Sequence, residues 1–71
     1  MLLTPVQLVC ARFGNGMILA KLLNVHYTTV YNWQSRRGGA IPDVYFQKIL
    51  KLARMQDIKL TSAELVDGGK L

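Results

Sequence analysis

Five side chains between positions 27 and 35 carry the chemistry of non-covalent recognition. If this segment is a helix with Val30 and Trp33 facing inward, a repeat of 3.6 residues per turn directs the five outward. They are two phenol rings, two hydroxyls and one carboxamide: Tyr27, Tyr31, Thr28, Ser35 and Asn32. Such groups stack and exchange hydrogen bonds without forming covalent bonds. The segment therefore predicts a surface that recognises a partner.

Covalent catalysis has little support elsewhere in the chain. Paired acids, a nucleophile with its base, or clustered metal ligands are needed, and none stands at workable spacing. His26 has no second His and no nearby Asp or Glu, which favours a helix cap or phosphate donor over a metal ligand or general base. No Gly-Lys-Ser/Thr follows the turn at 14–16, so a nucleotide loop is not expected, and Cys10 is interpreted as a small apolar residue. We expect no enzyme, metal or cofactor.

Charge is distributed unevenly along the 71 residues. Nine Lys and Arg stand against four Asp and Glu, for a formal net charge of +5, and every carboxylate follows residue 42. The cations before that point are Arg12, Lys21, Arg36 and Arg37. We interpret this half as an uncompensated positive region, which suits a polyanionic partner. The single cysteine and the lack of any apolar run near the roughly 18 residues of a membrane span predict a cytoplasmic location.

Capping residues and apolar spacing predict about five short helices and no strand, an all-α fold in a single domain over residues 1–71. Thr4-Pro5 begins the first helix, Asn15 caps a second that runs to about Leu23, and a third is expected over 27–35. Two C-terminal helices are expected over 42–55 and 62–67. Pro42 is expected to open the longer one, with Val44 on its apolar face and Lys48 solvated.

The stretch 15–36 meets the steric needs of a helix-turn-helix core. Two helices that cross through a very short turn need a small residue where they touch, a residue that tolerates positive φ, and apolar contacts from both sides. Ala20 and Asn24 satisfy the first two needs. The apolar contacts are Leu19, Leu23, Val25, Val30 and Trp33.

These positions resemble the helix-turn-helix of lambdoid phage Cro and repressor proteins. The Ala-Arg-Phe-Gly run at 11–14 is similar too. Ile41-Pro42, at the start of a later helix, resembles the all-helical branch of the Cro family and the YdaS-like prophage regulators. The resemblance covers about residues 5–66, with Asn24 where the family usually has Gly and His26 where a small cap is common.

The resemblance implies a lambda-repressor-like, sequence-specific double-stranded DNA-binding domain whose third helix enters the major groove. The residues expected to contact bases are Tyr27, Thr28, Tyr31, Asn32 and Ser35. Those expected to contact phosphates are Asn15, Gly16, Lys21, His26, Arg36 and Arg37. The implied function is that of a phage or prophage transcriptional repressor, which occupies a palindromic operator as a homodimer and has no small-molecule substrate.

Several apolar residues exceed what one small core is expected to use. They are Leu8, Met17, Ile18, Leu22, Ile58, Leu60, Leu65 and Val66. A protein interface is their natural use, and we expect homodimerisation through the region after Pro42. The alternative function is a protein-interaction module of the same fold, such as an antitoxin or anti-repressor. Salt-dependent DNA binding separates the two.

Overall fold

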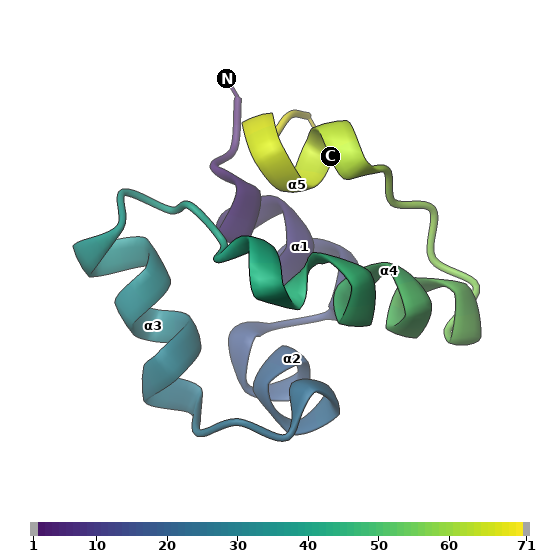
Figure 1. Ribbon diagram of the computed structural model, residues 1–71, viewed down its shortest axis with the longest axis horizontal. Coiled ribbons are helices and arrows are strands. Elements are labelled where there is room, and N and C mark those ends of the chain that lie inside the picture. The colour runs from purple at the N-terminus through teal and green to yellow at the C-terminus, as the bar shows by residue number, and fades with distance from the viewer. Residues whose placement is uncertain (1, 71) are drawn as a thin grey trace.

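All regular structure in the computed structural model, which describes residues 2–70, is helical (Figure 1). The elements are α1 (Pro5–Phe13), α2 (Gly16–Leu23), α3 (Tyr27–Arg36), a 3-10 turn η1 (Asp43–Tyr45), α4 (Phe46–Met55) and α5 (Ser62–Asp67). An isolated bridge joins Leu3 and Gly69, whose backbones exchange hydrogen bonds of 2.8 and 3.1 Å. The predicted all-α class is confirmed.

Side chains close to each helix start satisfy backbone amides that the helix itself leaves free. Thr4 and Gln7 form a reciprocal capping box at α1, and Thr61 and Glu64 form another at α5. At α2, the Asn15 Oδ1 atom accepts a hydrogen bond of 2.9 Å from the third amide of the helix. The helix starts predicted at these three positions are confirmed.

The core lies among the five helices: α2 packs on α1, α3 and α4, and α5 packs on α1 and α4 (Figure 1). Fully buried members of the core come from α1, α2, α4 and α5: Val9, Leu19, Leu23, Ile49, Ala53 and Leu65. α3 joins this core through Val30 and Trp33. The Trp33 ring also packs against Tyr45, with 5.0 Å between ring centroids. One apolar core therefore holds all five helices.

The helix expected to open at Pro42 begins later. The backbone of Pro42 is extended at ψ 136°, and η1 follows it before α4 starts at Phe46. A 3-10 turn has three residues per turn rather than 3.6, so its side chains point in different directions from those of an α-helix. Tyr45 turns toward Trp33, while Val44 is 79% exposed. The prediction that Val44 belongs to the apolar face is wrong.

Most of the apolar residues predicted to be surplus are used inside the fold. Leu8 is fully buried, and a Cβ at Gly69 would lie 3.8 Å from its Cδ2 atom, which shows that the C-terminal segment covers it. Leu65 is also buried, because α5 packs on α1. Three more are partly buried against the core: Leu22, Ile58 and Leu60. The surplus prediction is wrong for these five and holds for Met17, Ile18 and Val66, which are exposed.

A sharp bend separates α1 from α2, whose axes meet at 87°. Gly14 sits at the bend with φ +123°, and a Cβ there would lie 2.9 Å from the Ile18 Cδ1 atom. None of the helices in residues 2–70 is by itself long and apolar enough to cross a membrane; α1 and α2 reach that length and composition only when taken together across this bend. The bend sets the start of α2 beside the middle of α1.

Candidate nucleic-acid interface

The inner side of α3 packs against the core. Val30 and Trp33 are each 4% exposed. The carbonyl of Trp33 accepts a hydrogen bond of 2.9 Å from the Gly39 amide, and the Gly39 carbonyl accepts one of 3.0 Å from Val6 on α1. The end of α3 is thereby tied to the start of α1. This attachment leaves the other side of α3 uncovered.

The uncovered side of α3 holds all five residues predicted to contact bases. Tyr27 and Tyr31 are 54% and 64% exposed, and Thr28, Asn32 and Ser35 are exposed as well. The Ser35 hydroxyl donates a hydrogen bond of 3.2 Å to the Tyr31 carbonyl. The Asn32 carboxamide has no hydrogen-bond partner within residues 2–70 and so keeps both its donor and its acceptor.

The turn between α2 and α3 spans three residues, 24–26. Asn24 is left-handed (φ 59°, ψ 43°) and donates its amide to the Lys21 carbonyl at 3.1 Å, while Val25 donates to Ala20 at 3.0 Å. This pair of bonds is a Schellman closure of α2. Lys48 on α4 donates to the last carbonyl of α2, that of Leu23, at 2.8 Å. Lys48 is exposed, as predicted, but its ammonium also completes the end of α2.

His26 caps the start of α3. Its Nδ1 atom accepts a hydrogen bond of 3.3 Å from the Thr28 amide and lies 2.9 Å from the Thr28 hydroxyl. An accepting Nδ1 leaves the ring proton on Nε2, which is then a free donor. The imidazole also stacks on Tyr27, with 5.4 Å between ring centroids. One side chain thus orders the helix start and offers a hydrogen bond outward.

The other residues predicted to contact phosphates flank this face. The Asn15 side chain is occupied as a cap, but the amides of Gly16 and Met17, at the start of α2, have no partner in the described part of the chain. Free amides at a helix start favour anions. The cations Lys21, Arg36 and Arg37 are exposed and form no ion pair within residues 2–70. Lys21 precedes the turn, Arg36 is the last residue of α3 and Arg37 follows it, so positive charge lies at both ends of this helix.

Arg12 does not join this group, contrary to the interpretation of the N-terminal half as uncompensated. Its Nη2 atom lies 2.6 Å from Oε2 of Glu64, and its Nη1 atom donates to Oε1 at 2.8 Å. It also donates to the carbonyls of Lys59 and Lys70 at 2.8 and 3.2 Å. The hydrogen bond from Arg12 lowers the pKa of Glu64 below its ordinary value. The guanidinium therefore joins α1 to α5.

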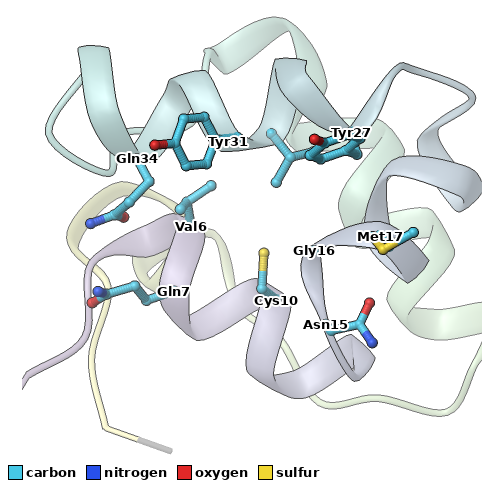
Figure 2. A pocket seen from close by; sticks show the side chains of 10 residues that line it. Val6, Gln7, Cys10, Asn15, Gly16, Met17, Tyr27, Tyr31 and Gln34 are labelled. Carbon is cyan, nitrogen blue, oxygen red and sulfur yellow. The ribbon is translucent and has the colours of Figure 1, made fainter.

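An apolar groove of about 390 Å³ lies between α1 and α3 and reaches the start of α2 (Figure 2). Val6 and Cys10 point into it from α1, and the rings of Tyr27 and Tyr31 border it from α3 (Figure 2). Burial raises the pKa of the Cys10 thiol, which favours its neutral form. No motif in the sequence marks this groove, because three separate segments form its walls.

Within residues 2–70, no group of three or more His, Cys, Asp or Glu side chains is close enough to hold a metal ion. Comparisons with protein-family models, curated proteins and solved structures found no match. The geometry of α3 and its surroundings is therefore the feature of the molecule that bears on function.

Proposed function

We propose that this protein binds double-stranded DNA in a sequence-specific manner by laying α3 in the major groove. The single observation that carries the proposal is the exposed side of α3, where five hydrogen-bonding or aromatic side chains lie between cations and no carboxylate interrupts them. A helix of ten residues is about 15 Å long, and the major groove is about 12 Å wide and admits such a helix. On this basis α2, the turn and α3 act as a helix-turn-helix.

Each contact follows from the side chain's free groups. Asn32 keeps donor and acceptor together and can pair with both N6 and N7 of adenine. The Thr28 hydroxyl is engaged by His26, so its methyl group is the part left for a thymine methyl. The two tyrosines can contact sugar and phosphate oxygens. The DNA phosphates on either side of the contacted bases are bound by the α2 amides, by Nε2 of His26 and by the three cations.

We propose further that the protein is a Cro-like repressor of the cytoplasm, which pairs as a homodimer and blocks polymerase by occupying a palindromic operator. A single half-site rarely supplies enough affinity, and paired subunits read half-sites about 34 Å apart. We assign the dimer contact to the region after Pro42. The large apolar side chains exposed there, among the described residues, are Val44, Met55 and Val66, at 79%, 69% and 60% exposure. Sedimentation equilibrium on the free protein should give twice the chain mass.

Selection of bound duplexes from a random library, followed by titration with salt, tests the DNA-binding function. We expect a palindromic consensus and an affinity that falls steeply as salt rises. Retention of no duplex at low salt would reject the function. The alternative, a protein-interaction module, is favoured by the exposure of Met17 and Ile18 on α2, at 63% and 42%. It predicts that any duplex binding lacks sequence preference.

A further inference from the structure

We propose that the groove between α1 and α3 binds a small, uncharged, planar and mainly apolar molecule. The inference goes beyond DNA binding and does not depend on it. At about 390 Å³, the groove falls within the range of roughly 300–1,000 Å³ that is common for small-molecule sites. It is therefore large enough to hold one or two fused rings.

The walls select an apolar and flat ligand. Val6 and Cys10 point into the groove from one side, and the rings of Tyr27 and Tyr31 border the other (Figure 2). Both tyrosines are more than half exposed, so a ligand between them and α1 removes aromatic surface from water. Aromatic rings prefer offset-stacked or edge-to-face partners, which a planar molecule supplies.

The lining also selects against charge. No Lys, Arg, Asp or Glu lines the groove in the described part of the chain. An ionised ligand would give up hydration on entering and gain no ion pair in return. A neutral molecule has no such cost.

Gln7 and Gln34 lie together at one end of the groove, with their side-chain amides at its outer end (Figure 2). The Gln7 Oε1 atom accepts a hydrogen bond of 3.1 Å from the Thr4 amide, and the Gln34 Oε1 atom accepts one of 2.9 Å from the Thr4 hydroxyl. Both side-chain oxygens are thus held by Thr4, and the surface that faces the groove is almost entirely apolar. A mainly apolar ligand therefore leaves no polar group of the groove unmatched.

The neutral, planar naphthyl ketone 6-propionyl-2-dimethylaminonaphthalene is a suitable probe, because its emission shifts to the blue in apolar sites. We expect a saturable blue shift with the free protein and no DNA present. An anionic analogue, 6-dimethylaminonaphthalene-2-sulfonate, should bind at least about tenfold more weakly, because no Lys or Arg lines the groove in the described part of the chain. Equal affinity for the two molecules would overturn the selection against charge, and the absence of saturable binding would overturn the site.

A variant that fills the groove locates the bound probe. A Cβ at Gly16 would lie 3.7 Å from Sγ of Cys10 and 3.8 Å from Cγ1 of Val30, which is ordinary contact, so a longer side chain there extends into the groove. Gly16→Leu should weaken probe binding at least about tenfold, because it occupies the volume the rings need. The matched control is Ala63→Leu, which introduces the same side chain at an exposed position in the first turn of α5 and should leave the affinity unchanged. Unchanged affinity in a folded Gly16→Leu protein overturns the assignment.

The single cysteine gives a second readout on the unaltered chain, which covers the case that Gly16→Leu fails to fold. Cys10 points into the groove, so a saturating probe should slow its alkylation by N-ethylmaleimide at least about fivefold (Figure 2). An alkylation rate that the probe does not alter overturns the site. Because no duplex is present, failure of the DNA-binding proposal leaves each of these results standing.

Discussion

Two regions of the molecule carry arginines that the charge pattern does not distinguish, yet the fold uses them differently. Arg12 is half-buried and reaches from α1 to α5, where it meets the Glu64 carboxylate and two backbone carbonyls. Arg36 and Arg37 are exposed at the end of α3 and form no ion pair within residues 2–70. Contacts made inside the fold, rather than the number of cations, therefore decide which charges remain for a second molecule.

The largest effect should come from removing the ring that holds α3 in place. Trp33→Ala leaves a cavity beneath α3 and should lower the free energy of unfolding by about 3–5 kcal/mol. Tyr31→Ala, on the uncovered side of the same helix, should change it by no more than about 0.5 kcal/mol. Urea denaturation followed by circular dichroism measures both. Similar losses in the two variants would contradict the division of α3 into an inner and an outer side.

The next effect concerns the recognition of DNA bases rather than the stability of the fold. Asn32→Ala should reduce discrimination at one base pair of each half-site by about 1–3 kcal/mol, because the paired hydrogen bonds to adenine are lost. Competition between the selected duplex and single-base variants measures this value. Thr29→Ala, on the same helix and half-buried, is the control and should keep the preference. If the Asn32 variant keeps the base preference, Asn32 is not part of the readout.

Removal of the half-buried arginine should affect the fold. Arg12→Ala breaks the ion pair with Glu64 and two hydrogen bonds to carbonyls, and should lower the free energy of unfolding by about 1–2 kcal/mol. Arg36→Ala should alter stability by no more than about 0.5 kcal/mol, since nothing in residues 2–70 pairs with it. Equal destabilisation by the two substitutions would remove the distinction between the two regions.

The exposed arginines should matter for DNA instead. Arg36→Ala and Arg37→Ala should each weaken binding to all duplexes and reduce the slope of log affinity against log salt by about 0.9, the value for one lost phosphate contact. Fluorescence anisotropy at several salt concentrations measures the slope. Lys59→Ala removes an equal charge from an exposed position away from α3 and should leave the slope as it is.

The smallest effect is a dependence of stability on pH. Because Arg12 lowers the pKa of Glu64 in the folded chain, this ion pair stabilises the fold fully above about pH 4.5, the ordinary pKa of the carboxyl, and the stabilisation is lost as the pH falls through the lowered value. The difference in stability between the natural chain and Glu64→Gln should therefore shrink toward acid. A difference that stays constant from neutral to acid pH would show that the charge of Glu64 contributes nothing.

Local features of the fold could be predicted from sequence because their causes are local. Thr4, Asn15 and Thr61 act on amides three residues away, and Asn24 closes α2 through its own backbone conformation. The side of α3 that faces inward is indicated in the same way by the apolar residue Val30, which faces the core. Each of these depends on neighbours within one or two helical turns.

Features that depend on distant segments could not be predicted. Arg12 and Glu64 are 52 residues apart, and Lys48 reaches a carbonyl 25 residues away. Neither pairing leaves a spacing pattern in the chain. The exposure of Val44 could not be predicted for a related reason. Tyr45 packs against Trp33 on another helix, and the backbone forms a 3-10 turn there instead of an α-helix. The groove between α1 and α3 likewise depends on how three segments approach one another.

The bridge between Leu3 and Gly69 has a consequence for cooperativity. The amides of Leu3 and Gly69 each donate to the carbonyl of the other residue, and the guanidinium of Arg12 binds the carbonyl of Lys70. Fraying of one terminus thus removes the partner of the other, so the two should exchange amide hydrogen for deuterium at one shared rate instead of opening separately. A tag fused at either end that disturbs the bridge should therefore raise the exchange rate of both amides.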